Sequence, residues 1–178
     1  MAGSADPAGL GLVTSLARPG GNVTGVTNNP GSGFINKRLQ LLKEAAPNVA
    51  RVAVLMTNFA VELRSFDEMR AAGPTLGVTP LPFTVDSPTE IDLVALAKLQ
   101  PDALYVFPNV INVRHSKAIL AHAAANRLPA IYGEREVVEA GGLMSYWTDW
   151  ISLRPPTRSS KAPSRPISPP SSRPSSSS

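Results

Sequence analysis

The chain has 178 residues, with 17 Lys and Arg against 13 Asp and Glu and a net charge of +4. This length can hold one domain with a sizeable core, or one domain followed by a tail. Residues 151–178 carry five basic residues and no acidic one, so residues 1–150 sum to −1. The greater part of the chain is therefore close to neutral, which argues against a nucleic-acid-binding surface there.

Cysteine is absent, which excludes a disulfide scaffold, a thiolate metal site and a cysteine nucleophile. No apolar run approaches the roughly 20 residues that a membrane-spanning helix needs, so we expect no membrane insertion. The opening sequence MAGSADPAGLGLV has no basic n-region and no apolar segment of sufficient length. We therefore expect no export signal in this chain.

The first thirty residues predict only brief structure. Residues 8–17 can form a short helix that ends at the breaker Arg18-Pro19-Gly20-Gly21. Residues 23–26 predict a short strand, and residues 27–33 a loop.

From residue 35 onward the apolar pattern predicts alternating helices and strands. Helices are expected at 35–46, 60–72, 89–99 and 115–126, and strands at 51–56, 78–85, 103–107 and 130–132. Residues 86–88 are expected to cap the third of these helices, and Pro80 and Pro82 move the strand at 78–85 to a sheet edge. Apolar strands alternating with helices indicate an α/β fold, a Rossmann-like or flavodoxin-like lobe with a parallel sheet covered on both faces.

The segment LPAIYGEREVVEAGGLMSY, residues 128–146, predicts how this sheet ends. A short strand stops at Gly133, a ligand-facing loop follows, and a return strand begins after Gly141 and Gly142. In open α/β sheets small molecules bind at the carboxyl ends of the strands, where Glu134 and Arg135 are expected.

Polar side chains follow several of the predicted strands. They are Thr27, Asn28, Asn29, Asn58, Asn109, Glu134 and Arg135. Such side chains suit hydrogen bonds to a small polar solute. An Asn after a strand is also simply a good turn residue, so no single position decides between the two interpretations. The repeated placement favours a solute site.

Motifs for catalysis, metals and cofactors are missing from the sequence. His115 and His122 share a face of one predicted helix, but no third ligand lies beside them at metal-site spacing. There is no G-x-S-x-G elbow, no P-loop and no third glycine after Gly9 and Gly11. We therefore expect no catalytic residue, no metal and no cofactor.

Five blocks of the sequence together resemble one family. They are DPAGLGLVTSLARPGGNVTGV at residues 6–26, KRLQLLKEAAP at 37–47, RVAVLMTN, PDALYVFP and RLPAIYGEREVVEAGGLMSY. The family is that of ABC-transporter substrate-binding proteins of the tryptophan/tyrosine-binding type. In it two α/β lobes joined by a hinge close around a small solute, for which an amino acid is the candidate here, and deliver it to a membrane permease without covalent chemistry.

The resemblance implies one lobe of a type I periplasmic-binding-protein fold. Residues 1–30 resemble the end of the first lobe and a hinge crossing, residues 31–146 resemble the second lobe, and residues 147–178 form a tail outside both. The implied partners are a small-molecule solute, which fits between the two lobes, and the ABC permease subunits. The parent family is extracytoplasmic. The implied solute-facing positions are Thr27, Asn28, Asn58, Asn109, Glu134 and Tyr146.

The tail departs from the family. Its Ser, Pro and Arg composition predicts disorder, and Trp147 stands where the family usually has Gly. Codons can be chosen for residues 155–178 so that a reading one base earlier gives AADSIFQGALPADLPAEQPTKFEL, which resembles the family's C-terminal sequence. We predict that the tail is that sequence read out of frame, with a genuine disordered basic arm as the alternative. Translating the DNA of this locus in all frames decides between them.

Three functional hypotheses remain open. The first is a solute-binding component of an ABC importer that lacks most of its first lobe and binds solute weakly or not at all, because half of the cleft wall is missing. The second is a fold-related enzyme or sugar-responsive regulator, for which the sequence offers neither a base–nucleophile pair nor a DNA-binding helical module. The third is an inactive α/β remnant.

Overall fold

The computed structural model describes residues 2–4, 8, 11–15, 18, 20–21, 25–27 and 32–146. Near the N-terminus, β1 (Ala2–Ser4) pairs in parallel with β2 (Gly25–Thr27). Residues 11–14 form a turn and bends, so the helix expected over residues 8–17 is wrong in its described part. Gly11 explains this, because its φ of 69° is a left-handed conformation that an α-helix cannot contain. Residues 147–178, and with them the predicted tail, lie outside the described residues.

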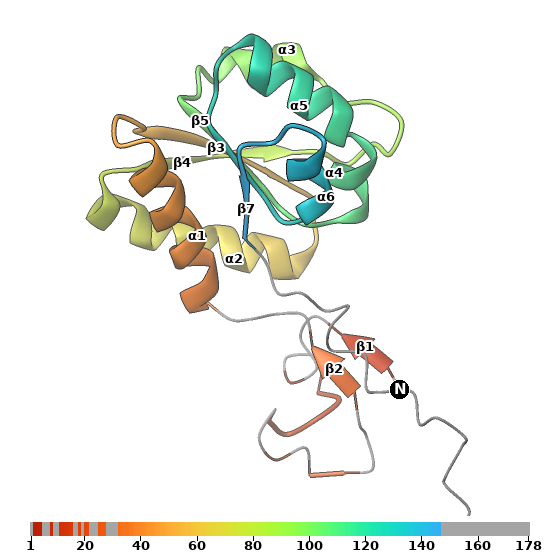
Figure 1. Ribbon diagram of the computed structural model, residues 1–178. Coiled ribbons are helices and arrows are strands. Elements are labelled where there is room, and N and C mark those ends of the chain that lie inside the picture. The colour runs from red at the N-terminus through yellow and green to blue at the C-terminus, as the bar shows by residue number, and fades with distance from the viewer. Residues whose placement is uncertain are drawn as a thin grey trace, which may run out of the picture. The chain divides into compact units, whose positions relative to one another are not determined.

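Within the described residues, a second sheet has five parallel strands in the order β4-β3-β5-β6-β7 (Figure 1). Their bounds are β3 Arg51–Met56, β4 Thr79–Thr84, β5 Ala103–Val106, β6 Ala130–Tyr132 and β7 Met144–Ser145. This is the order of doubly wound flavodoxin-like sheets, which confirms the predicted fold class. Strand β4 lies at the sheet edge, as Pro80 and Pro82 predict.

Helices cover both faces of this sheet. Their bounds are α1 Ser32–Ala45, α2 Ala60–Ala72, the 3-10 helix η1 Gly73–Leu76, α3 Leu93–Lys98, α4 Val110–Arg114, α5 Ser116–Ala125 and α6 Arg135–Glu139. Helices α1 and α2 lie on one side of the sheet, and α3, α4, α5 and α6 lie on the other (Figure 1).

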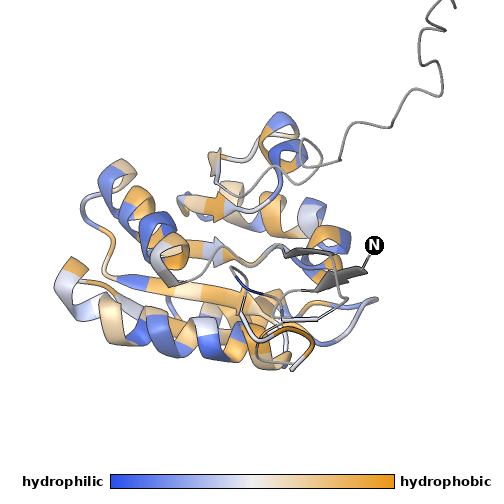
Figure 2. Cartoon of the chain, turned by 90° about the horizontal axis from the view of Figure 1, so that it is seen from below, coloured by the Kyte–Doolittle hydropathy of each residue, from blue (hydrophilic) through white to orange (hydrophobic). Residues whose placement is uncertain are grey.

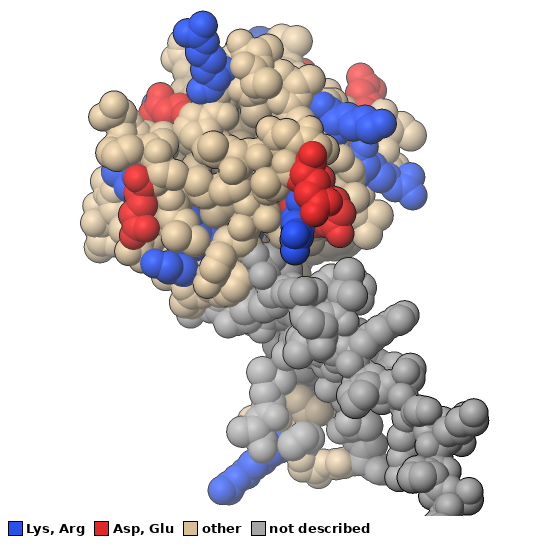
Figure 3. Space-filling view, viewed as in Figure 1, with Lys and Arg blue, Asp and Glu red and all other residues tan. Residues whose placement is uncertain are grey.

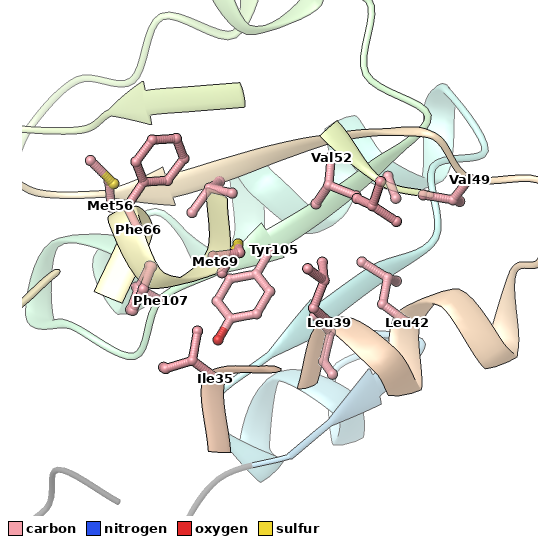
Figure 4. Close-up of a cluster of buried hydrophobic side chains, with 14 residues drawn as sticks. Ile35, Leu39, Leu42, Val49, Val52, Met56, Phe66, Met69, Tyr105 and Phe107 are labelled. Carbon is pink, nitrogen blue, oxygen red and sulfur yellow. The ribbon is translucent and has the colours of Figure 1, made fainter. Parts of the chain in front are cut away.

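The core consists of two layers, one on each face of the sheet. In β3, Val52 and Val54 pack toward α1 and α2, whereas Ala53 and Leu55 pack toward α3 and α5. Figure 4 shows the first layer, and Figure 2 shows apolar residues along the strands and on the helix sides that face them. A strand buried on both faces needs the continuous apolar run that RVAVLM provides. The sequence pattern and the fold agree here.

The helices differ from the expectations at four places. Helix α1 begins at Ser32 rather than at residue 35, so it takes in the end of the loop expected at 27–33. Helix α3 begins at Leu93 rather than at residue 89, because the cap is Asp92, whose Oδ1 accepts the Ala95 N–H at 2.8 Å. The helix expected at 115–126 begins at Ser116 and follows the separate helix α4. The loop expected after β6 is largely the helix α6.

On the face shown in Figure 3, acidic and basic side chains of the described residues are interspersed rather than gathered by sign. Among the described helices, none is long and apolar enough to cross a membrane.

Candidate functional site

Four of the predicted site residues lie along the carboxyl edge of the five-stranded sheet. Asn58 follows β3, Asn109 follows β5, Glu134 follows β6 and Tyr146 follows β7. Because the strands are parallel, their carboxyl ends share one edge. The sheet order reverses between β3 and β5, and ligands of doubly wound sheets bind outside such a reversal point. Thr27 is the last residue of β2, in the two-stranded sheet, and Asn28 and Asn29 lie outside the described residues.

A buried carboxylate joins the loops on the two sides of this reversal point. Glu62 lies in the first turn of α2 and is 7% exposed. Its Oε2 accepts the Thr57 N–H at 2.6 Å, and the Asn109 Nδ2 donates to Oε1 and Oε2 at 3.1 and 3.2 Å. Glu62 therefore links the chain just after β3 to the chain just after β5.

Asn109 and Asn112 extend this link. Asn109 is the N-cap of α4, and its Oδ1 accepts the Asn112 N–H at 2.8 Å. The buried Asn112 Nδ2 donates to the carbonyls of Leu55 and Phe107 at 3.0 and 2.9 Å, one at the end of β3 and the other just after β5. We call Thr57, Glu62, Asn109 and Asn112 the Glu62 network.

Burial raises the pKa of the Glu62 carboxyl above its ordinary value of 4.5. The hydrogen bonds from Thr57 and Asn109 act in the opposite direction, because they favour the charged form, and burial outweighs them. A buried carboxylate with both oxygens engaged is a structural group rather than a free acid or base.

Two further contacts tie the loop after β4 to its neighbours. Asn58 Nδ2 donates to Asp86 Oδ2 at 2.7 Å on the exposed surface. His115 lies between α4 and α5, is buried, and its Nε2 is 2.8 Å from the Ser87 carbonyl oxygen. His115 and His122 are not on one helix, contrary to expectation. No group of metal-ligating side chains occurs among the described residues.

A buried arginine lies beneath the β5 and β6 ends of the edge. Arg38 of α1 is fully buried, and its Nη2 donates to the carbonyls of Val106 and Ile131 at 3.1 and 3.5 Å. Its guanidinium carbon is 4.2 Å from the centroid of the Tyr105 ring, a cation–π contact. Figure 4 shows that ring pointing from the sheet toward α1, near Ile35 and Leu39. Burial lowers the pKa of Arg38, and Tyr105 and then Glu134 oppose that shift.

Glu134 and an aromatic pair complete this part of the edge. Glu134 is partly buried, which raises the pKa of its carboxyl, while the charge of Arg38 opposes the rise. Tyr146 is 39% exposed, and its ring stacks on Phe34 with centroids 4.8 Å apart and an interplanar angle of 22°. The Tyr146 N–H donates to the Tyr132 carbonyl at 3.1 Å, which fixes it beside the end of β6. We call Phe34, Arg38, Glu134 and Tyr146 the aromatic side of the edge.

Gly133 lies where the aromatic side meets the Glu62 network. A Cβ added at Gly133 would overlap the side chain of Pro108, which directly precedes Asn109. Only glycine lets the ends of β5 and β6 approach this closely.

A concavity lies at the opposite, amino edge of the sheet. It has a volume of about 420 Å³ and is lined by Ala46, Pro47, Asn48, Val49, Pro101, Asp102, Leu128 and Pro129. The Asp102 carboxylate there already accepts the N–H groups of Ala50 and Arg51. The carboxyl edge, with partly exposed charged and aromatic groups, is the better candidate site.

Comparison with known proteins identifies the family. The family model described as ABC transporter substrate binding protein matches residues 1–153. The chain belongs to this family. Its match covers both described sheets and ends before most of the Ser/Pro/Arg tail.

Individual relatives of this substrate-binding family agree with that assignment. The chain is 26% identical over 156 residues to a tyrosine-binding protein of Clostridioides difficile (strain R20291), covering 86% of this chain and 44% of the relative. The crystal structure of an ABC domain in complex with L-Trp from Streptococcus pneumonia matches with a TM-score of 0.71 and 28% identity, covering 83% of this chain and 50% of that chain. A ligand-free, open substrate-binding protein with adhesive properties from Clostridium difficile matches with a TM-score of 0.61 and 26% identity, covering 78% and 46%. The chain spans about half the length of these relatives.

Sequence reasoning missed the buried polar residues of the edge, namely Arg38, Glu62 and Asn112. An Arg or Glu on an amphipathic helix is normally solvated, which is why neither stood out. A positional signal did exist for Arg38, which follows Ile35 by three residues and precedes Leu42 by four, and so shares their apolar face.

Proposed function

We propose that the protein is a solute-binding component of an ABC importer and that the carboxyl edge of its five-stranded sheet contacts an amino acid with an aromatic side chain. The observation that carries the proposal is the partly exposed Tyr146 ring, stacked on Phe34 at the same edge as the Glu134 carboxylate. Relatives that bind tyrosine and L-Trp support the choice of solute class.

The chemistry of the aromatic side suits such a solute. A flat aromatic ring gains from stacking or edge-to-face contact with a tyrosine ring. A carboxylate such as Glu134 accepts hydrogen bonds from an ammonium group, and a partly desolvated carboxylate does so more strongly than one in water. Asn58 lies farther along the same edge, after β3, and offers a further amide whose nitrogen also donates to Asp86.

Binding between two lobes needs a second wall that faces the carboxyl edge of this sheet. The chain spans about half the length of its relatives, so a first lobe would enclose the solute from the other side. Such a pair of lobes would work outside the cytoplasm, pass the solute to permease subunits and perform no covalent chemistry. A single wall buries only part of the solute, so we expect weak binding, with a dissociation constant on the order of millimolar.

Titration of the full chain with L-tryptophan, followed by backbone amide NMR, tests the proposal. We expect the amides of Glu134 and Tyr146 to shift, with a smaller shift at Asn58. L-Alanine is the control solute, because it has the same amino and carboxyl groups but no ring. Tyr146→Phe should keep the response and Tyr146→Ala should remove it. Shifts at the amino-edge concavity alone, or equal responses to both solutes, would overturn the proposal.

A further inference from the structure

We propose that Glu62 is a positioning residue that holds the loops after β3 and β5 pre-formed at the solute-facing edge, before any solute arrives. The inference takes its functional meaning from the proposed function, because these loops carry Asn58 and flank the edge. Its structural basis is independent of that function.

The location of Glu62 is the first step. In doubly wound sheets the loops after the two strands at the reversal point diverge and leave a crevice. Here those strands are β3 and β5. The Glu62 carboxylate lies between the two loops, with Thr57 on one side and Asn109 on the other. The protein therefore fills the space at the reversal point with its own hydrogen-bonded side chains.

The second step is the set of hydrogen bonds around the Glu62 carboxylate. Each oxygen of Glu62 accepts at least one hydrogen bond, and the Asn109 amide is used at both ends, as donor to Glu62 and as cap acceptor for Asn112. Asn112 then returns to the carbonyls of Leu55 and Phe107. Both groups of the Asn109 amide are therefore engaged within the protein. We expect other residues along the edge, rather than Asn109, to contact solute.

The third step is energetic. Hydrogen bonds to a charged, desolvated acceptor are stronger than those between neutral groups, and a missing partner leaves a buried donor unsatisfied. Two loops that are bonded to the same acceptor are restrained relative to each other. Pre-formed loops spare the solute the cost of ordering them, which is how pre-organisation raises affinity.

Amide hydrogen exchange of the full chain without solute tests the inference. In Glu62→Gln the side chain keeps its shape, but its new amide nitrogen faces the Asn109 Nδ2, so two donors meet. We expect exchange at Thr57 and Asn112 to become roughly ten- to hundredfold faster, while amides of the α5 and β6 core change little. Glu68→Gln, which removes the same charge from the same helix outside the network, is the control and should leave both amides unchanged.

A double substitution separates positioning from mere stability. Combining Glu62→Gln with Asn109→Asp exchanges donor and acceptor, so that the introduced glutamine amide donates to the introduced aspartate, which can still cap α4. We expect the slow exchange at Thr57 and Asn112 to return. Unchanged exchange in Glu62→Gln, a uniform acceleration over the whole sheet, or no recovery in the double variant would each overturn the inference. Failure of wild-type amides to respond to L-tryptophan would instead contradict the proposed function, and the exchange result would stand.

Discussion

The two parts of the carboxyl edge are built on opposite principles. In the Glu62 network, polar side chains bond to one another and to backbone groups, and the Glu62 carboxylate is 7% exposed with both oxygens engaged. On the aromatic side, a buried cation lies beneath, while the Glu134 carboxylate and the Tyr146 ring remain partly open to solvent. The contrast fits the two proposed roles, in which the network fixes loop geometry and the aromatic side offers groups to a solute.

The largest effect on stability is expected at Arg38, the buried residue of the aromatic side. Arg38→Ala leaves a cavity and removes the donor to the Val106 and Ile131 carbonyls together with the cation–π contact. We expect a loss of roughly 3–5 kcal/mol in the free energy of unfolding, measured with urea. Arg38→Met, which retains much of the volume and buries no charge, should lose less. The exposed Arg114→Ala is the control, and equal losses in Arg38→Ala and Arg114→Ala would contradict this assignment.

How far sequence predicts this edge depends on the kind of signal each part carries. The strands RVAVLM and ALYV were predictable because burial on both faces requires uninterrupted apolar residues. The edge placement of Asn58, Asn109, Glu134 and Tyr146 followed from strand ends alone.

Which of those side chains are engaged could not be predicted, because it depends on contacts between residues far apart in the chain. Asn109 meets Glu62 across 47 positions, and Arg38 meets Ile131 across 93. Short helices were missed for a related reason. Helix α4 has only five residues, too few to show a helical period, and its cap hydrogen bond is a tertiary detail.

The junction between the two sides should tolerate almost no added volume. In Gly133→Ala the new methyl group meets Pro108, whose ring cannot rotate away. We expect a loss of about 1–3 kcal/mol in the free energy of unfolding. Gly33→Ala is the matched control, because a Cβ there meets nothing within 4 Å and alanine favours the first turn of α1. A Gly133→Ala protein as stable as Gly33→Ala would show that the two sides are not closely joined.

The aromatic pair is expected to matter less for stability than for recognition. Tyr146→Ala removes the stacking on Phe34, which is worth about 0.5–1.5 kcal/mol. Tyr146→Phe keeps the ring and should melt near the wild type. Thermal unfolding of both variants measures the difference. A Tyr146→Ala loss well above this range would mean that the ring is a core group rather than a surface for solute.

The Glu62 network should make the free energy of unfolding depend on pH. Burial raises the folded-state pKa of Glu62 above 4.5, so between the unfolded and folded values the native state binds more protons. Stability from this group is therefore greatest at low pH and falls as pH rises through the raised pKa. Glu134 contributes in the same direction. We expect Glu62→Gln to show a shallower fall than wild type in urea titrations from pH 4 upward, and Glu68→Gln to match wild type. A steeper fall in Glu62→Gln would reverse the sign assigned here.

The smallest effect belongs to a polar contact that resembles the network but is exposed. Asn58 donates to Asp86 at 2.7 Å on the surface, whereas Asn112 makes its two carbonyl contacts while 2% exposed. Water replaces a lost surface partner but cannot reach the buried carbonyls. We expect Asn58→Ala to change the free energy of unfolding by no more than about 0.5 kcal/mol and Asn112→Ala to lower it by about 1–3 kcal/mol. Comparable losses in the two variants would mean that burial does not decide how much each asparagine contributes to stability.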